Sequence, residues 1–208
     1  MTEVHPSEPH PIEAESYRIM RSRIDLSTLP LLTRAVTERV IHATADFDYV
    51  TDLVCDEAAL AAGVAALRCA APVIADVAMV ASGITGYPVI CRIGDSLSAR
   101  LARTANITLS AAAGRLAHGE AGPGAIWLVG CAPTALTELI SRQVEPALVI
   151  GVPVGFVGAT DAKESLRASG LPALSNISEK GGSAVAVAAF NALLRVAREP
   201  VADAEPAR

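Results

Sequence analysis

Five short apolar runs alternate along the chain with longer segments of helical periodicity. The candidate strands are PVIAD (72–76), YPVICRI (87–93), AIWLVG (125–130), ALVIGV (147–152) and LPALSNI (171–177). The candidate helices span residues 12–24, 31–45, 56–70, 97–118, 133–143, 160–168 and 182–197, and Asn106 is a candidate break in the fourth. This alternation predicts βαβ units. We therefore expect a three-layer α/β/α fold, in which a mostly parallel sheet of about five strands has helices on both faces.

The chain has 208 residues, enough for one domain of good size and hardly enough for two. Hydrophobic residues make up 51% of it but aromatic residues only 3%, so the core must consist of Ala, Val, Leu and Ile. Such residues suit close packing of helices on a parallel sheet that is buried on both faces. We expect a flexible N-terminal arm over residues 1–11, a single domain over 12–197 and a polar tail over 198–208.

Charge and composition exclude several classes of function. The net charge of -5 and the lack of a basic face argue against a nucleic-acid partner. The four cysteines form no C-x-x-C pair, so we expect free thiols in a reducing cytoplasm and no metal site. The N-terminus has no apolar signal region, and no apolar run reaches the ~18 residues that a membrane helix needs. We expect a cytoplasmic protein without a membrane partner.

Three glycine-containing loops follow predicted strands. Gly130 comes before Pro133, a residue that favours the start of a helix. Gly151, Gly155 and Gly158 follow the next strand, and the pair Gly181–Gly182 leads into the last helix. Each glycine has an alternative explanation as tight-turn chemistry. Together, these three glycine loops predict an anion-binding rim of free N–H groups beyond the carboxyl ends of the strands. Neither a G-x-G-x-x-G nor a P-loop motif is present, which argues against a dinucleotide or nucleoside triphosphate site.

His42 is the candidate acid–base residue. It lies in LLTRAVTERVIHATAD, whose apolar stripe is Leu32, Val36, Val40 and Ala43. Helical spacing brings His42 together with Glu38, Arg39 and Asp46 on a different face. Histidine is the side chain best suited to exchange a proton near neutral pH. The alternative interpretation of this segment is a solvated helix face.

Several segments resemble the precorrin-8X methylmutase family, also called cobalt-precorrin-8 methylmutase. They are AESYRIMRSRIDL, ERVIHATAD, PVIADVAMVASGIT, APTAL, GVPVGFVGATDAKESL and SEKGGSAVAVAAFNALL. The resemblance runs from about Ile12 to Leu194, in the family's order. Its most specific part is the string G-x-P-V-G-F-V-G-A, followed by an acidic residue and Lys163.

The resemblance implies a homodimeric isomerase of cobalamin biosynthesis that needs no cofactor. In its tetrapyrrole-derived substrate, a methyl group would move from ring carbon C-11 to C-12, giving hydrogenobyrinate or its cobalt form. The family's histidine, which donates and accepts the proton, corresponds to His42. The substrate-binding residues correspond to Ser16, Arg21, Arg39 and Thr85.

The chain departs from the family pattern at two positions that concern substrate binding. Leu109 stands where the family usually has an arginine for substrate carboxylates, and Cys131 stands where it commonly has an asparagine. Arg115 is a candidate replacement for that arginine. The loop after Thr85 is also shorter than in many relatives.

These departures keep two other functions open. One is a corrinoid-binding protein that has kept the pocket but lost efficient turnover, which Leu109 and Cys131 favour. The other is an unrelated α/β enzyme that binds a phosphate ester at the glycine loops. The combination of His42, Ser16 and Thr85 favours an active methylmutase over the unrelated α/β enzyme.

Overall fold

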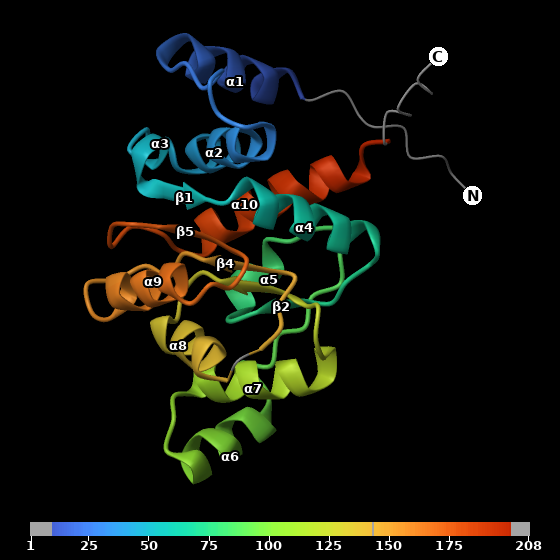
Figure 1. Cartoon of the computed structure of the whole chain (residues 1–208), viewed down its shortest axis with the longest axis vertical. Helices are drawn as coiled ribbons and strands as arrows, with labels where there is room; N and C mark the ends of the chain where they lie inside the picture. Colours follow the sequence, from blue (N-terminus) through green and yellow to red (C-terminus); the bar gives the residue numbers. More distant parts are fainter. Residues whose placement is uncertain (1–9, 143, 201–208) are drawn as a thin grey trace.

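A computed structural model describes residues 10–142 and 144–200. Its centre is a five-stranded sheet, shown in Figure 1. The strands lie in the order β1 (Leu53–Cys55), β5 (Ala173–Asn176), β4 (Leu148–Gly151), β3 (Ile126–Val129) and β2 (Val73–Ala75). Strands β2 to β5 are parallel, and β1 pairs antiparallel with β5 at one edge. The predicted α/β class with a mostly parallel sheet is confirmed.

Helices cover both faces of the sheet. One face carries α2 (Leu31–Thr44), α4 (Glu57–Arg68), α5 (Ala78–Ser82) and α10 (Ser183–Arg198). The other carries α7 (Leu109–Ala121), α8 (Pro133–Ser141) and α9 (Ala159–Ala168). The remaining helices lie outside these layers or connect them: α1 (Pro11–Arg23) packs on α2, α6 (Ser96–Ala105) packs on α7, and α3 (Tyr49–Asp52) leads into β1.

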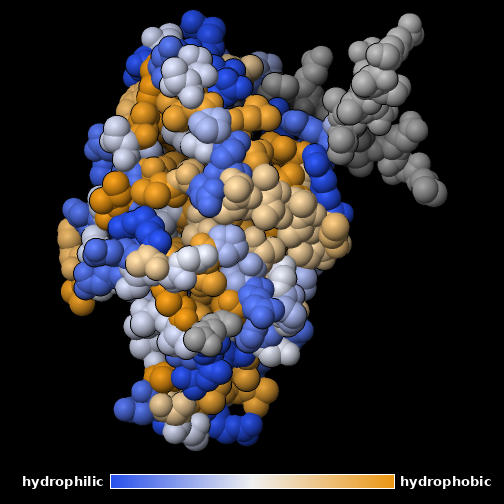
Figure 2. Space-filling model, viewed as in Figure 1, coloured by the Kyte–Doolittle hydropathy of each residue, from blue (hydrophilic) through white to orange (hydrophobic). Residues whose placement is uncertain are grey.

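The core forms two aliphatic clusters, one on each side of the sheet. The larger lies between the sheet and α2, α4 and α10, and it includes Phe190 and Val36. The smaller lies under α7, α8 and α9, around Trp127 and Leu136. The low aromatic content thus corresponds to a core of aliphatic residues in close contact. Exposed alanines of α4 add a moderately apolar patch to the surface (Figure 2).

The strand predicted over 87–93 is wrong. This segment makes only an isolated parallel bridge, between Ile90 and Ile74 of β2. Pro88 has no N–H to donate to a ladder, and the carbonyl of Arg92 instead accepts a bond from Ser98 at the start of α6. The segment therefore runs beside the sheet edge without joining it.

Other elements also differ from the sequence prediction, which includes neither α3 nor α5. The fifth strand is β1, a three-residue segment that the apolar pattern does not reveal. The helix predicted over 97–118 is two helices, α6 and α7, separated near the candidate break. Asn106 adopts a left-handed conformation with φ of 51°, and Thr108 caps α7 by accepting the Ala111 N–H.

Other helix boundaries agree with the prediction to within two residues at each end. Asp56 caps α4 as expected, since its side chain accepts the N–H of Ala58. Within residues 10–142 and 144–200, no helix has the length and apolar character to cross a membrane. Residues 1–9 of the expected arm and 201–208 of the expected tail lie outside the described residues.

Candidate active site

An open hollow of about 420 Å³ lies beside His42, between α1 and α2. Its lining residues come from these two helices and the residue before α1: His10, Ile12, Glu13, Ser16, Arg39 and His42. We call it the α1–α2 hollow. It contains the predicted catalytic residue and two of the four predicted substrate-binding residues, Ser16 and Arg39.

Two contacts from α1 fix the imidazole of His42. The Oγ atom of Ser16 lies 3.0 Å from Nδ1, within hydrogen-bond distance. The ring of Tyr17 stacks on the imidazole, with centroids 4.7 Å apart and planes 5° from parallel. Among the described residues, no hydrogen bond joins a partner to Nε2 of His42. The half-buried side chain is therefore held by one nitrogen and one face, while its other nitrogen remains available for chemistry.

Arg39 supplies the positive charge of the hollow. Its guanidinium donates to Glu13 at 2.9 Å and to the Tyr17 hydroxyl at 3.4 Å. About one third of each side chain in the Arg39–Glu13 pair remains exposed to solvent. A substrate carboxylate can therefore reach the guanidinium, whose planar donors suit bidentate binding.

The other predicted substrate-binding residues do not line the α1–α2 hollow. Arg21 makes two hydrogen bonds to Glu38, at 2.9 and 2.7 Å, and its guanidinium lies over the Tyr17 ring. Thr85 is exposed in the loop after α5, on a separate part of the molecule. The predicted helix face forms only in part. Glu38, Arg39 and His42 all lie on α2, but Asp46 lies beyond the end of this helix, after the left-handed residue Ala45. Asp46 instead pairs with Lys180 at 2.7 Å.

The three glycine loops lie at the carboxyl ends of β3, β4 and β5, where α8, α9 and α10 begin. The N-cap residue of each helix makes no side-chain cap. At the start of α8, however, the Asp76 carboxylate accepts the N–H groups of Cys131 and Ala132, both at 2.8 Å. Two hydrogen bonds join the second and third loops: Gly155 N–H to Glu179 at 3.1 Å, and Gly182 N–H to Val152 at 2.8 Å. The described lining of the α1–α2 hollow includes no residue of these loops. The hollow at His42 and the predicted anion-binding rim of the glycine loops therefore do not form one pocket within a single chain.

Sequence reasoning misses three lining residues of the hollow, His10, Ile12 and Glu13. It also misses Tyr17, which stacks on His42. The sequence places His10 in a solvated arm, but it caps α1 by accepting the Ile12 N–H at 3.3 Å. Glu13 and Tyr17 flank Ser16 at positions that share one face of a helix. This spacing is the sequence signal that could have identified Glu13 and Tyr17 as neighbours of Ser16, because all three lie in the helix predicted over 12–24.

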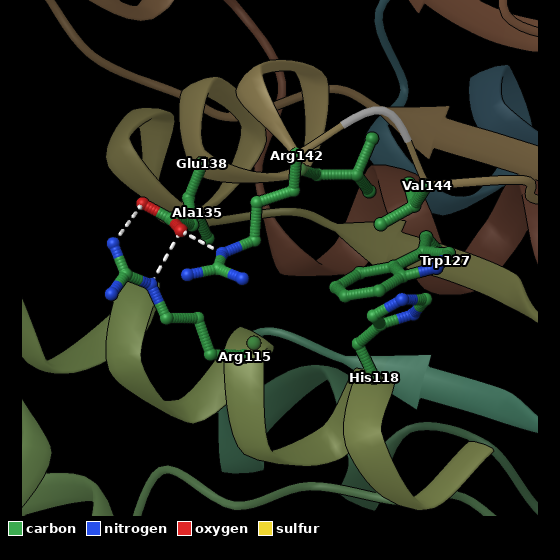
Figure 3. A pocket seen from close by; sticks show the side chains of 9 residues that line it. Arg115, His118, Trp127, Ala135, Glu138, Arg142 and Val144 are labelled. Carbon is green, nitrogen blue, oxygen red and sulfur yellow. Dashed lines mark hydrogen bonds and ion pairs between the residues drawn. The ribbon is translucent and has the colours of Figure 1, made fainter. Parts of the chain in front are cut away.

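A second, much smaller pocket lies between α7 and α8, with a volume of about 10 Å³. Figure 3 shows Arg115 and Arg142 converging on Glu138, and the His118 ring facing Trp127. Both arginine Nε atoms lie 2.5 Å from the same Glu138 oxygen. This space suits about one water molecule. Arg115 is therefore paired with Glu138 and does not line the α1–α2 hollow.

Both departures from the family pattern lie near the start of α8. Leu109 is the first residue of α7 and is 42% exposed. The preceding Thr108 donates to Thr134 of α8 at 2.8 Å. The N–H of Cys131 donates to buried Asp76 at 2.8 Å, and burial raises the pKa of that carboxyl. The described residues contain no cluster of three or more metal-ligating side chains.

Comparisons with known proteins agree with this arrangement. The family model of precorrin-8X methylmutase matches residues 11–196. A cobalt-precorrin-8 methylmutase of Salmonella typhimurium is 40% identical over 92% of this chain and 97% of its own length. A precorrin-8X methylmutase of Pseudomonas aeruginosa is 38% identical over 88% of this chain and 93% of its own.

Solved structures give the same result. The chain resembles a precorrin-8x methyl mutase from Thermus thermophilus with a TM-score of 0.81 and 35% identity, over 89% of this chain and 95% of that one. A match of this extent includes most of the sheet and its covering helices. The chain therefore belongs to the precorrin-8X methylmutase family of isomerases, enzymes that move a methyl group within one molecule.

Proposed function

We propose that this chain moves a methyl group from C-11 to C-12 of precorrin-8X or cobalt-precorrin-8, with His42 as the proton donor and acceptor. The product would be hydrogenobyrinate or its cobalt form, cobyrinate. The observation that carries the proposal is the held imidazole, which has Ser16 on Nδ1, Tyr17 on one face and Nε2 available. Family membership supports a methylmutase of cobalamin biosynthesis.

The contacts of His42 suit a proton that leaves and returns. A serine hydroxyl can accept a hydrogen bond from a protonated Nδ1 or donate one to an unprotonated Nδ1. When a doubly protonated imidazole gives its Nε2 proton to the conjugated macrocycle, Nδ1 keeps its own proton. Ser16 can therefore hold the ring in both charge states by accepting from Nδ1. The bond from the methyl group to C-11 then breaks as the bond to C-12 forms. Nε2 takes the proton back, so the reaction has no net proton change.

The substrate has several carboxylate side chains, and the chain offers two kinds of partner for them. Arg39 lies in the α1–α2 hollow, next to the proposed proton donor. The uncapped N-termini of α9 and α10 offer N–H groups and a favourable helix dipole. Carboxylate binding would thereby orient the ring before the methyl shift.

A direct test is to incubate the purified protein with precorrin-8X and follow the change in its visible spectrum. We expect catalytic conversion, with many product molecules formed per protein molecule. Tight binding of coloured corrinoid without conversion would instead support the binding-protein alternative, which Leu109 and Cys131 favour. If the protein neither bound nor converted precorrin-8X, both the methylmutase proposal and the binding-protein alternative would be contradicted.

Leu109→Arg is expected to improve substrate binding. The side chain is exposed at the first turn of α7, so the fold can accept an arginine there. A new partner for a substrate carboxylate in this partly solvated place should lower KM by about tenfold. Steady-state kinetics would measure it, with Leu97→Arg on α6 as the matched control for added charge. An equal change in both variants, or none in either, would contradict a role for position 109.

We also propose that the protein is a homodimer, and apolar side chains on the surface support this. Phe156 is 93% exposed and Val157 is 89% exposed, both in the loop after β4, and Met79 on α5 is 73% exposed. Large apolar side chains gathered on a surface favour contact with another protein. The α1–α2 hollow is open, so a second copy could also help to enclose the substrate.

Phe156→Glu is expected to convert the dimer to a monomer, because it places a charge in an apolar contact. Light scattering coupled to size-exclusion chromatography would give the mass of each variant. Leu31→Glu, at a leucine that is 64% exposed on α2, is the matched control and should remain dimeric. A monomeric wild-type protein would contradict the proposal.

A further inference from the structure

Lys163 is a buried lysine that the proposed chemistry does not use. It belongs to the string GVPVGFVGATDAK, lies on α9 and has an exposed fraction of 0%. Its Nζ donates to Asn176 Oδ1 at 3.0 Å, to the Lys180 carbonyl at 2.8 Å and to the Ser178 carbonyl. All three acceptors belong to the end of β5 or to the loop that follows it.

The number of acceptors shows which charge state of Lys163 suits the site. An ammonium group has three N–H donors, one for each of the three acceptors. A neutral amine has only two donors and a lone pair, so one of these three hydrogen bonds would be lost. The Ser178 and Lys180 carbonyls would keep only the donor that they share, the side-chain amide of Asn176, at 3.3 and 2.9 Å. The geometry of the loop is therefore matched to the protonated lysine.

The loop held by Lys163 covers residues 177–182, and Asp52 holds it from the other side. The Asp52 carboxylate accepts the N–H of Ile177 at 3.1 Å, and the N–H and hydroxyl of Ser178 at 2.7 and 2.9 Å. It also accepts the side-chain amide of Asn176 at 2.8 Å. Burial favours protonation of Asp52, but these donors outweigh burial and lower its pKa. An ammonium, an amide and a carboxylate thus form one buried network beneath the loop.

The same loop connects two parts of the proposed site. Lys180 reaches Asp46 and Asp48, which follow the helix of His42, at 2.7 and 2.6 Å. Gly182 is the residue before α10, and its N–H donates to Val152 at the end of β4. A change in the loop would therefore move the uncapped start of α10 relative to the His42 end of α2.

We infer that Lys163 is a positioning residue, which as an ammonium keeps the 177–182 loop in the shape that presents the start of α10 to a substrate carboxylate. This inference rests on the proposed function for the identity of the ligand. The loop geometry itself does not depend on that function. Loss of the lysine proton should loosen the loop and weaken substrate binding without altering proton transfer at His42.

Burial of Lys163 places this transition close to neutral pH. Burial lowers the pKa of Lys163 to about 8, Asp52 and Glu179 oppose this shift, and Arg167 adds to it. Between about 8 and the ordinary value of 10.5, the folded chain binds fewer protons at this group than the unfolded chain. The contribution of Lys163 to the free energy of unfolding therefore rises with pH in that window. Weaker substrate binding above pH 8 would then reflect a change in the 177–182 loop and not global unfolding.

The first test uses the two lysines of the chain, Lys163 and Lys180. In protein labelled with ¹³C at lysine Cε, we expect one NMR signal to titrate with a midpoint near 8, and Lys180→Met assigns it to Lys163. The amide signals of Ser178 and Gly181 should shift with the same midpoint. A Lys163 midpoint at the ordinary lysine value of ~10.4, or loop amides that do not follow it, would overturn the inference. This test requires no substrate, so its outcome is independent of the proposed function.

The second test compares wild-type protein with Lys163→Met, which keeps the length of the side chain and removes its donors. We expect KM to rise by about tenfold with kcat nearly unchanged, since the lost interaction concerns binding. Wild-type KM should also rise as pH passes 8, whereas KM of the variant should stay flat. A fall in kcat at unchanged KM, or the same pH profile in both proteins, would contradict positioning by Lys163. If Lys163→Met does not fold, the wild-type titration still decides the question.

Discussion

His42→Ala is expected to lower kcat by about 10²- to 10⁴-fold, because it removes the group proposed to give the proton to the ring and take it back. Binding of the product should change little, since Arg39 and the glycine loops are left intact. The loss should therefore fall on kcat and not on KM. Stopped-flow spectroscopy of a single turnover would measure the chemical step directly.

Two further variants make this experiment specific to His42. Ser16→Ala removes the hydrogen-bond partner of Nδ1 but keeps Nε2, so its loss should be clearly smaller than that of His42→Ala. His118→Ala removes a histidine in the small pocket between α7 and α8 and should retain wild-type kcat. A His42→Ala variant with near-normal kcat would show that another group transfers the proton.

Gly181→Ala is expected to have the largest effect on stability. Gly181 has φ of 141°, which is costly for any residue with a Cβ, and the added atom would collide with the Val152 carbonyl oxygen. The backbone strain alone should lower the free energy of unfolding by about 1–3 kcal/mol. The displaced carbonyl should also disturb the bond from Gly182 that joins the second and third glycine loops.

Urea denaturation with Gly94→Ala as the control would measure this effect. A Cβ added at Gly94 would have no neighbouring atom within 4 Å, and the φ of this residue is not positive. The Gly94→Ala variant should therefore remain within about 0.5 kcal/mol of wild type. We also expect a raised KM in Gly181→Ala, since the loop shapes the start of α10. Equal free energies of unfolding for the two variants would show that the backbone at position 181 accepts a Cβ without strain.

Much of the fold can be predicted because local patterns decide it. The parallel strands β2, β3 and β4 are continuous apolar runs, and helices begin at recognisable signals such as Asp56 and Pro133. Strand β1 escapes prediction because three residues carry too little periodicity, and its pairing with β5 depends on tertiary contacts. The strand predicted over 87–93 fails for the opposite reason. Its apolar pattern is strong enough to suggest a strand, but Pro88 has no N–H to donate to a neighbouring strand.

The candidate site is predictable only in part. Ser16, Arg39 and His42 follow from the resemblance, and the structure brings them into one hollow. Their neighbours Glu13 and Tyr17 need the pairing of α1 with α2, which helical spacing within one segment does not contain. Thr85 and the glycine loops lie apart from the hollow in the single chain. The hollow lies where α1 packs on α2, whereas the loops follow the strands β3, β4 and β5.

The position of the bound ring tests the central claim most directly. A crystal structure of the protein with hydrogenobyrinate should place the ring in the α1–α2 hollow, with Nε2 of His42 about 3–3.5 Å from the conjugated system near C-11 and C-12. A ring bound elsewhere on the protein, or an imidazole whose Nε2 points away from the ring, would contradict it.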